Sequence, residues 1–138
     1  MRTIPALLDT DILSAIMRRN PVVVSKAREY LREHHRFTFS ILTRYEILRG
    51  LKAKGASKQE HAFESFCDAN TVFPLSDDII VQAAAIYADL HRRGELIGDA
   101  DILIGATALV QGFGVVTNNV SHFGRIKGLF VESWLSSA

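Results

Sequence analysis

Acidic residues stand at three separated places in the sequence, each beside a run of apolar residues that a folded chain would bury. The acids are Asp9 and Asp11 in "LLDTDILS", Glu46 in "LTRYEIL", and Asp99 and Asp101 in "IGDADILIGATAL". Carboxylates that meet in a fold repel one another unless they are protonated or share a cation. Because these ligand atoms are all oxygens, the cation would be Mg²⁺ or Mn²⁺ rather than zinc. Such a cluster favours phosphodiester hydrolysis, since the ion neutralises the phosphate and lowers the pKa of a bound water.

Each of these acids also has an ordinary structural explanation. Asp11, Asp99 and Asp101 are residues of the kind that cap helices or occupy their first turn. Glu46 could form an ion pair with an arginine of its own helix. Asn118 and Asn119 in "VVTNN" suit a turn, because asparagine tolerates left-handed backbone. Only convergence of the acids in the fold favours a shared site over these explanations.

Other kinds of site have little support. None of the five histidines falls in an H-E-x-x-H pattern, and neither G-x-x-x-x-G-K-[ST] nor G-x-G-x-x-G is present. A Ser/His/Asp nucleophile lacks any local signature. Cys67 is the single cysteine, which excludes an internal disulfide and a cysteine-rich zinc site and fits a reducing cytoplasm.

Length and composition predict one domain over residues 1–138, which buries about two-thirds of the surface of its unfolded chain. The sequence is 48% hydrophobic and 22% charged, with a formal net charge of +1. Binding of a nucleic acid must therefore depend on how the charges are distributed. Ile102–Val110 is about half as long as a bilayer-spanning helix, and Asp9 ends the first apolar run too early for a signal peptide. We expect a cytoplasmic protein.

Short apolar stretches alternate with amphipathic ones along the chain. Strands are expected at Ile4–Leu8, at Arg36–Phe39, and in "TVFPL", "GVVTNN" and "LFVES". Helices are expected to about Arg18, over Val22–Glu33, over "ILTRYEILRGLKAKG", from Ser57 to about Asp68, over "SDDIIVQAAAIYADLHRRG", and over Asp101–Gln111. This alternation predicts an α/β fold whose mostly parallel sheet is covered by helices on both faces. In such folds the site lies beyond the carboxyl ends of the strands, where Asp9 follows the first strand.

Five stretches resemble the PIN domain in order and spacing, and more narrowly the VapC toxins of bacterial type II toxin–antitoxin pairs. They are "LLDTDILS", "YEILRG", "GDADILIGATAL", "VVTNNVSHFGRIKGL" and "VESW", which together run from about Leu7 to Trp134. The resemblance implies a Rossmann-like α/β/α sandwich and a Mg²⁺- or Mn²⁺-dependent endoribonuclease that cuts tRNA or rRNA. It also implies a homodimer and a cognate VapB-type antitoxin.

The resemblance assigns roles to several positions of this sequence. Asp9, Glu46 and Asp101 match the first three acids of the family's site. The fourth position falls at Asn119 (at Asn118 if the register slips by one), where many PIN domains have Asp. The metal ligands implied are Asp9 and Asp101, with Asp99 compensating for the missing fourth acid.

Two further polar residues stand beside these positions. Asp11 occupies a place where the family more often has Asn, so we expect it to act mainly as the cap of the first helix, with Thr10 as the other candidate cap. Thr117 is expected to orient the nearby carboxylates or their water.

RNA needs a positively charged approach to such an acidic site. The candidates are Arg44 and Arg49 beside Glu46, and Arg92 and Arg93 in "HRRG". For the last two, a solvated helix end that is favoured by the helix dipole explains the charges equally well.

Two alternatives remain open at this point. "DTD" also resembles the D-x-D start of haloacid-dehalogenase-type phosphatases, which would use Asp9 and Asp11, but Leu13 stands where that family has Thr or Val and Glu46 would have no role. The other alternative is a catalytically degenerate PIN domain that only binds a partner, which Asn119 would permit.

Overall fold

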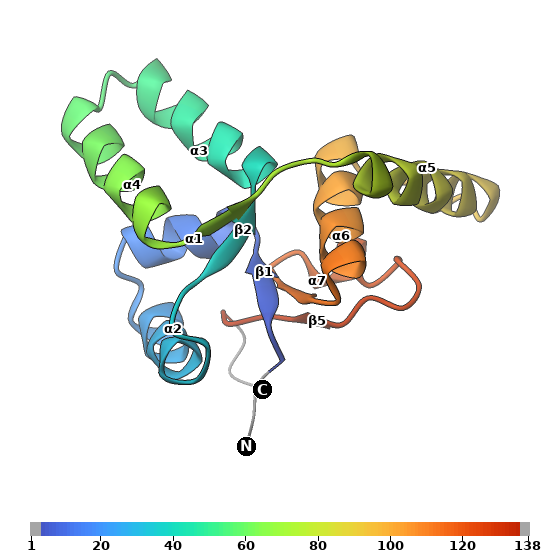
Figure 1. Cartoon of the computed structure of the whole chain (residues 1–138), viewed down its shortest axis with the longest axis horizontal. Helices are drawn as coiled ribbons and strands as arrows, with labels where there is room; N and C mark the ends of the chain where they lie inside the picture. The colour runs from blue at the N-terminus through green and yellow to red at the C-terminus, as the bar shows by residue number, and fades with distance from the viewer. Residues whose placement is uncertain (1–3, 136–138) are drawn as a thin grey trace.

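A single parallel sheet forms the centre of the structure, a computed structural model that describes residues 4–135. The predicted domain of residues 1–138 extends beyond it at residues 1–3 and 136–138, which lie outside the described residues. The strands are β1 (Ala6–Leu8), β2 (Thr38–Ser40), β3 (Thr71–Phe73), β4 (Gly114–Val116) and β5 (Val131–Glu132). Their order across the sheet is β3-β2-β1-β4-β5, and every pairing is parallel. The predicted α/β sandwich is therefore confirmed, with β1 at the centre of the sheet (Figure 1).

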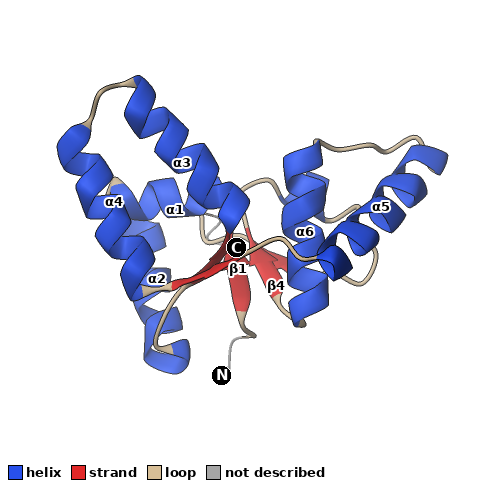
Figure 2. Ribbon diagram, turned by 45° about the horizontal axis from the view of Figure 1, so that its top comes forward, coloured by secondary structure: helices blue, strands red, loops and turns tan. Residues whose placement is uncertain are grey.

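Helices cover both faces of the sheet, as Figure 2 shows, with α1 to α4 on one side and α5 and α6 on the other. Their bounds are α1 (Thr10–Met17), α2 (Pro21–His34), α3 (Ile41–Ala53), α4 (Ser57–Ala69), α5 (Asp77–Arg92), α6 (Asp99–Gln111) and α7 (Val120–Phe123). No helix within residues 4–135 is long and apolar enough to cross a membrane.

The alternation of side chains along β1 divides the core into two clusters. Ala6 and Leu8 pack with residues of α1, α2, α3 and α4, whereas Leu7 between them packs with α5 and α6. This follows from the two-residue period of a strand, which sends neighbouring side chains to opposite faces. All three residues are at most 1% exposed. Since both faces of β1 are buried, its carboxyl end is held firmly between the two helical layers.

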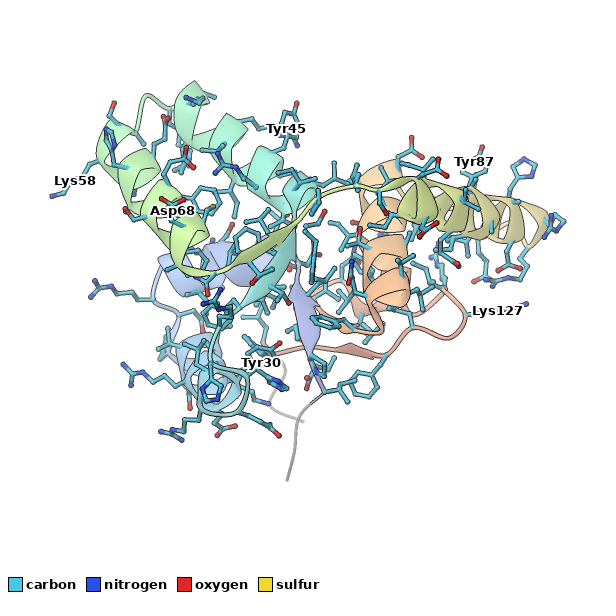
Figure 3. The ribbon with its side chains drawn as sticks, in the orientation of Figure 1. Tyr30, Tyr45, Lys58, Asp68, Tyr87 and Lys127 are labelled. Atoms are coloured by element: carbon cyan, nitrogen blue, oxygen red, sulfur yellow. The ribbon has the colours of Figure 1, made fainter. Side chains whose placement is uncertain are left out.

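A tyrosine anchors α2 to the central strand. The Tyr30 hydroxyl accepts the Ala6 N–H at 3.1 Å and donates to the Ala6 carbonyl at 3.3 Å, and Figure 3 shows the ring reaching from α2 towards β1. Tyr30 is 3% exposed, so both hydrogen bonds are shielded from water. These hydrogen bonds fix the position of α2, including the side chains on its outer face, relative to the sheet.

Most expected elements are present, with three corrections that concern the site. The last helix before β4 begins at Asp99 rather than Asp101, because Gly98 is its N-cap. The strand in "GVVTNN" ends at Val116, before the asparagines. A short helix, α7, follows Asn119, and the sequence analysis did not predict it.

Candidate active site

The acids from "LLDTDILS" and "GDADIL" meet at the carboxyl ends of β1 and β4, which lie side by side with Leu8 opposite Val116. The ladder continues one residue further, since the Asp9 N–H donates to the Val116 carbonyl at 2.9 Å. Asp9 follows β1 directly, and Asp101 lies in the first turn of α6. Electrostatic contacts connect these acids: the charges of Asp11 and Asp101 both raise the pKa of Asp9.

Asp9 is the most deeply buried of these acids, with 7% of its surface exposed. One carboxylate oxygen accepts the Thr10 N–H at 2.8 Å, and the other accepts the Thr117 hydroxyl at 2.8 Å. The pKa of Asp9 is nevertheless raised to about 7, because burial penalises the charged form and the Asp11 carboxylate lies nearby. The expectation that Thr117 orients a carboxylate of the site is met by this hydrogen bond. A charge held here at neutral pH needs a compensating positive charge.

Asp11 does not cap the first helix, which corrects the sequence interpretation. Asp9 is the N-cap of α1, and Thr10 and Asp11 already lie within the helix. One Asp11 oxygen, Oδ2, accepts the Asn118 N–H at 3.0 Å. The other, Oδ1, is buried and has no hydrogen-bond partner. Burial raises the pKa of Asp11, and the Asp101 charge adds to the effect. Asp11 therefore contributes an unsatisfied oxygen to the same group of acids.

Glu46 of α3 is joined to the site by a hydrogen bond from the Thr10 hydroxyl. The sequence pattern had indicated Thr10 only as a candidate helix cap. Thr10 Oγ1 donates to Glu46 Oε1 at 2.6 Å, and the Glu46 charge raises the pKa of Asp101. Arg49 lies one turn further along α3, with its Nη2 3.9 Å from Glu46 Oε2. In the sequence, the signal for this contact of Thr10 was its position between two acids of the candidate site, Asp9 and Asp11. Asp9, Asp11, Glu46 and Asp101 thus form one electrostatically connected group.

Asn119 and His122 complete the edge of the site beside Asp101. His122 Nδ1 lies 2.7 Å from Asn119 Nδ2 and 3.5 Å from Asp101 Oδ2. Because one nitrogen cannot accept and donate at once, Nδ1 either accepts from the Asn119 amide or, when it carries a hydrogen, donates to Asp101. The Asn119 N–H donates to Thr117 Oγ1 at 2.9 Å, so the same threonine supports both Asp9 and the start of α7. Burial raises the pKa of Asp101, and His122 opposes that shift.

A sequence model of the PIN domain matches residues 6–129, which span all of these positions. The chain belongs to the PIN domain family. This membership agrees with the resemblance seen in the sequence and leaves the phosphatase alternative without support.

Two relatives and one solved structure that are similar to this PIN domain all have VapC or VapBC in their names. It is 35% identical over 88 residues to "Ribonuclease VapC1" of Methanocaldococcus jannaschii, a match that covers 64% of this chain and 62% of that protein. It is 28% identical over 134 residues to the "tRNA(fMet)-specific endonuclease VapC" of Salmonella typhimurium, which covers 93% of this chain and 96% of the relative. Among solved structures it is similar to DNA-bound VapBC from Salmonella typhimurium, with a TM-score of 0.83, 28% identity, and coverage of 96% of this chain and 99% of that one.

The donor atoms of this PIN domain suit a hard divalent cation. The carboxylates offer only oxygen ligands, and the buried, unpartnered Asp11 Oδ1 is an atom that a cation would satisfy. Within residues 4–135, no three acidic, histidine or cysteine side chains lie close enough together in the unbound structure to hold a metal ion. Asp99 is exposed at the start of α6 and makes no side-chain hydrogen bond or ion pair within the described part of the chain. Its predicted role as a metal ligand stays a prediction.

Of the arginines predicted to bind RNA, the structure brings only Arg49 to the carboxylates. Arg44 points to α4 instead, where it forms an ion pair with Glu64 and donates to Cys67 Sγ at 3.4 Å. Arg93 donates to Asp89 at 2.8 Å and to Glu95 at 2.8 Å, so its charge is already paired. Arg92 is exposed near the end of α5. Two of the expected RNA contacts would therefore require existing ion pairs to break.

Proposed function

We propose that this PIN domain is a VapC-type toxin: an endoribonuclease that depends on Mg²⁺ or Mn²⁺ and belongs to a bacterial toxin–antitoxin pair. The observation that carries the proposal is the convergence of Asp9, Asp11, Glu46 and Asp101 at one sheet edge. The relatives described above are named as a ribonuclease and a tRNA-specific endonuclease, which supports RNA as the substrate class.

The proposal assigns two kinds of role: some side chains would bind the cation, and others position those side chains. Asp9 and Asp101 are the proposed ligands, with Glu46 beside them. When bound, the cation would neutralise the scissile phosphate and lower the pKa of a water. Thr117 fixes the Asp9 carboxylate through its hydroxyl, and Thr10 does the same for Glu46. Each hydroxyl restricts the rotation of the carboxylate that it contacts.

Partners and location follow from the same proposal. VapBC complexes among the solved relatives support a VapB-type antitoxin as the binding partner. We further propose a homodimer that acts in the cytoplasm on tRNA or rRNA.

The deciding experiment is cleavage of total RNA by the purified protein in Mg²⁺, in Mn²⁺ and in EDTA. We expect cleavage only with a divalent ion and its loss in Asp9→Asn and Asp101→Asn. Asp68→Asn is the matched control, because Asp68 is an exposed acid on α4 (Figure 3). Equal cleavage by Asp9→Asn and the control would remove Asp9 from the mechanism.

A partner-binding PIN domain without catalysis is the second candidate, favoured by the neutral Asn119 at the fourth family position. It predicts that the protein binds RNA or its antitoxin but leaves RNA intact in every divalent ion. Growth arrest on expression, relieved by the neighbouring antitoxin gene and absent in Asp9→Asn, would contradict it.

A further inference from the structure

Positive charges that lack an acidic partner are concentrated in the segment from the end of α1 to the start of β2. In the described chain, no cation of this segment forms an ion pair; these cations are Arg18, Arg19, Lys26, Arg28, Arg32 and Arg36. Elsewhere in the described chain several cations are paired, as in Arg44–Glu64, Lys52–Glu60 and Arg93–Asp89. Lys54, Lys58 and Arg92 are separate charges outside this segment that form no ion pair with a described residue. An unpaired guanidinium can bind an incoming anion without first losing a partner.

Three of these residues line one groove along α2. The groove has a volume of about 570 Å³ and is lined by Arg19, Arg28 and Arg32, together with Pro21, Val24, Ser25 and Glu29. Arg28 and Arg32 are four residues apart on α2 and so project from the same face of the helix. All three arginines are exposed, and Glu29 is the only acid among the lining residues. We call this surface the arginine groove.

A second groove connects the arginine groove to the candidate active site. It has a volume of about 560 Å³ and lies between α1, α3 and α4. Its lining includes Thr10 and Glu46 of the site as well as Arg18 and Arg19, and Arg19 also lines the arginine groove. The path follows α1, which rises about 10 Å from Thr10 to Met17 at the usual 1.5 Å per residue, and Arg19 follows two residues later. A strand of a few nucleotides could therefore occupy both ends of the path.

We propose that the arginine groove binds the phosphate backbone of an RNA strand whose scissile phosphate lies at the carboxylates. This inference rests on the proposed ribonuclease function and specifies where the substrate extends beyond the site. Guanidinium groups suit phosphate because they donate two parallel hydrogen bonds to it. The acids of the active site repel phosphates, so attraction at a distance from them is needed to hold the strand. An acidic segment of a protein is the competing occupant.

The test uses the full chain in the non-cleaving Asp9→Asn background and measures binding of a 30-nucleotide single-stranded RNA by fluorescence anisotropy across a salt series. The variant is Arg28→Gln/Arg32→Gln, and glutamine keeps nearly the helix propensity of arginine. The control, Lys26→Gln/Lys58→Gln, removes the same charge from residues that line neither groove, one of them on α2 itself. We expect the slope of log affinity against log salt to fall by about 1.4 for two lost phosphate contacts, with the control near the parent.

Cleavage by the same substitutions in the active protein separates this inference from the proposed function. We expect the groove variant to cleave a long RNA more slowly but a dinucleotide at the parent rate, because a dinucleotide at the carboxylates does not reach the groove. If the parent cleaves no RNA in Mg²⁺ or Mn²⁺, the proposed ribonuclease function is refuted. The binding test would still show whether the arginine groove binds RNA. If the groove variant binds long RNA with the affinity and salt slope of the control, the RNA path is refuted. Loss of antitoxin binding with RNA binding intact would likewise overturn it in favour of an acidic protein segment.

Discussion

Replacing Asp9 by asparagine should stabilise the protein when no divalent ion is present. The pKa of Asp9 is raised from 3.8 to about 7, chiefly by burial. Between about pH 4 and pH 7, Asp9 is protonated in the folded state but has lost its proton in the unfolded state. The free energy of unfolding therefore falls as the pH rises from about 4 to about 7. A difference of about three pH units corresponds to about 4 kcal/mol. The full penalty is present above pH 7 and absent below pH 4.

Asparagine removes the charge but disturbs one hydrogen bond. Its oxygen can still accept the Thr10 N–H, whereas the Thr117 hydroxyl loses the carboxylate that accepts its proton. That loss costs about 1 kcal/mol, which leaves a net gain of about 3 kcal/mol at pH 8. For a chain of this size the gain corresponds to a rise of about 10 °C in Tm. At pH 4.5 the variant and the parent should be nearly equal.

The measurement is urea or thermal unfolding of both proteins in EDTA between pH 4.5 and pH 8, with Asp68→Asn as a control for the loss of one exposed charge. Adding Mn²⁺ at pH 8 should stabilise the parent and leave Asp9→Asn almost unchanged, because the cation compensates the buried charge of Asp9. A parent whose stability does not change from pH 5 to pH 8 in EDTA would refute the reasoning, as would a variant that is less stable than the parent at pH 8.

Three further substitutions test other parts of the structure. Asp11→Asn keeps an acceptor for the Asn118 N–H but removes the charge, and should weaken Mn²⁺ binding about tenfold in titration calorimetry; unchanged affinity would mean that Asp11 only supports the turn. Gly105→Ala should change the free energy of unfolding by less than about 1 kcal/mol in urea, because its Cβ would lie 2.5 Å from Ile126 Cδ1, the terminal atom of a side chain that can shift, and the gain in helix propensity offsets the cost of that shift. Tyr30→Phe should cost about 1–3 kcal/mol by the same measurement, since the buried Ala6 N–H loses the hydroxyl that accepts it, whereas the Ala6 carbonyl keeps the Thr38 hydroxyl; a cost near zero would show that water replaces the Tyr30 hydroxyl.

Local signals predicted most of the fold because they act within a few residues. Ser40 and Ser76 cap α3 and α5 through their hydroxyls, as their positions before helical stretches indicated. Gly55 and Gly94 follow helices with positive φ, the conformation that glycine adopts without a steric penalty. The apolar stretches around Leu7 are short enough to be strands and are buried on both faces.

The details that sequence reasoning missed depend on contacts between distant residues. "DTD" contains three consecutive residues that could cap a helix, and only the end of β1 decides that Asp9 does so. Arg44 stands two residues before Glu46 in the sequence, yet it pairs with Glu64 twenty residues away on α4. No local pattern distinguishes an arginine that faces substrate from one that faces a neighbouring helix. The free cations on α2 could be found only by accounting for every ion pair in the fold.

The resemblance to the PIN family implies two positions at which this chain departs from the family pattern, and the structure shows where they lie. The family more often has Asn where this chain has Asp11, and often has Asp where it has Asn119. The structure brings the two positions together, because Asp11 accepts the N–H of Asn118, the neighbour of Asn119. The acid that follows β1 and the asparagine that follows β4 therefore lie at the same edge of the sheet, at the ends of adjacent strands. Asp11 thereby brings to this edge of the sheet a buried oxygen that no group in the described part of the chain satisfies, and such an atom is what a bound cation would contact.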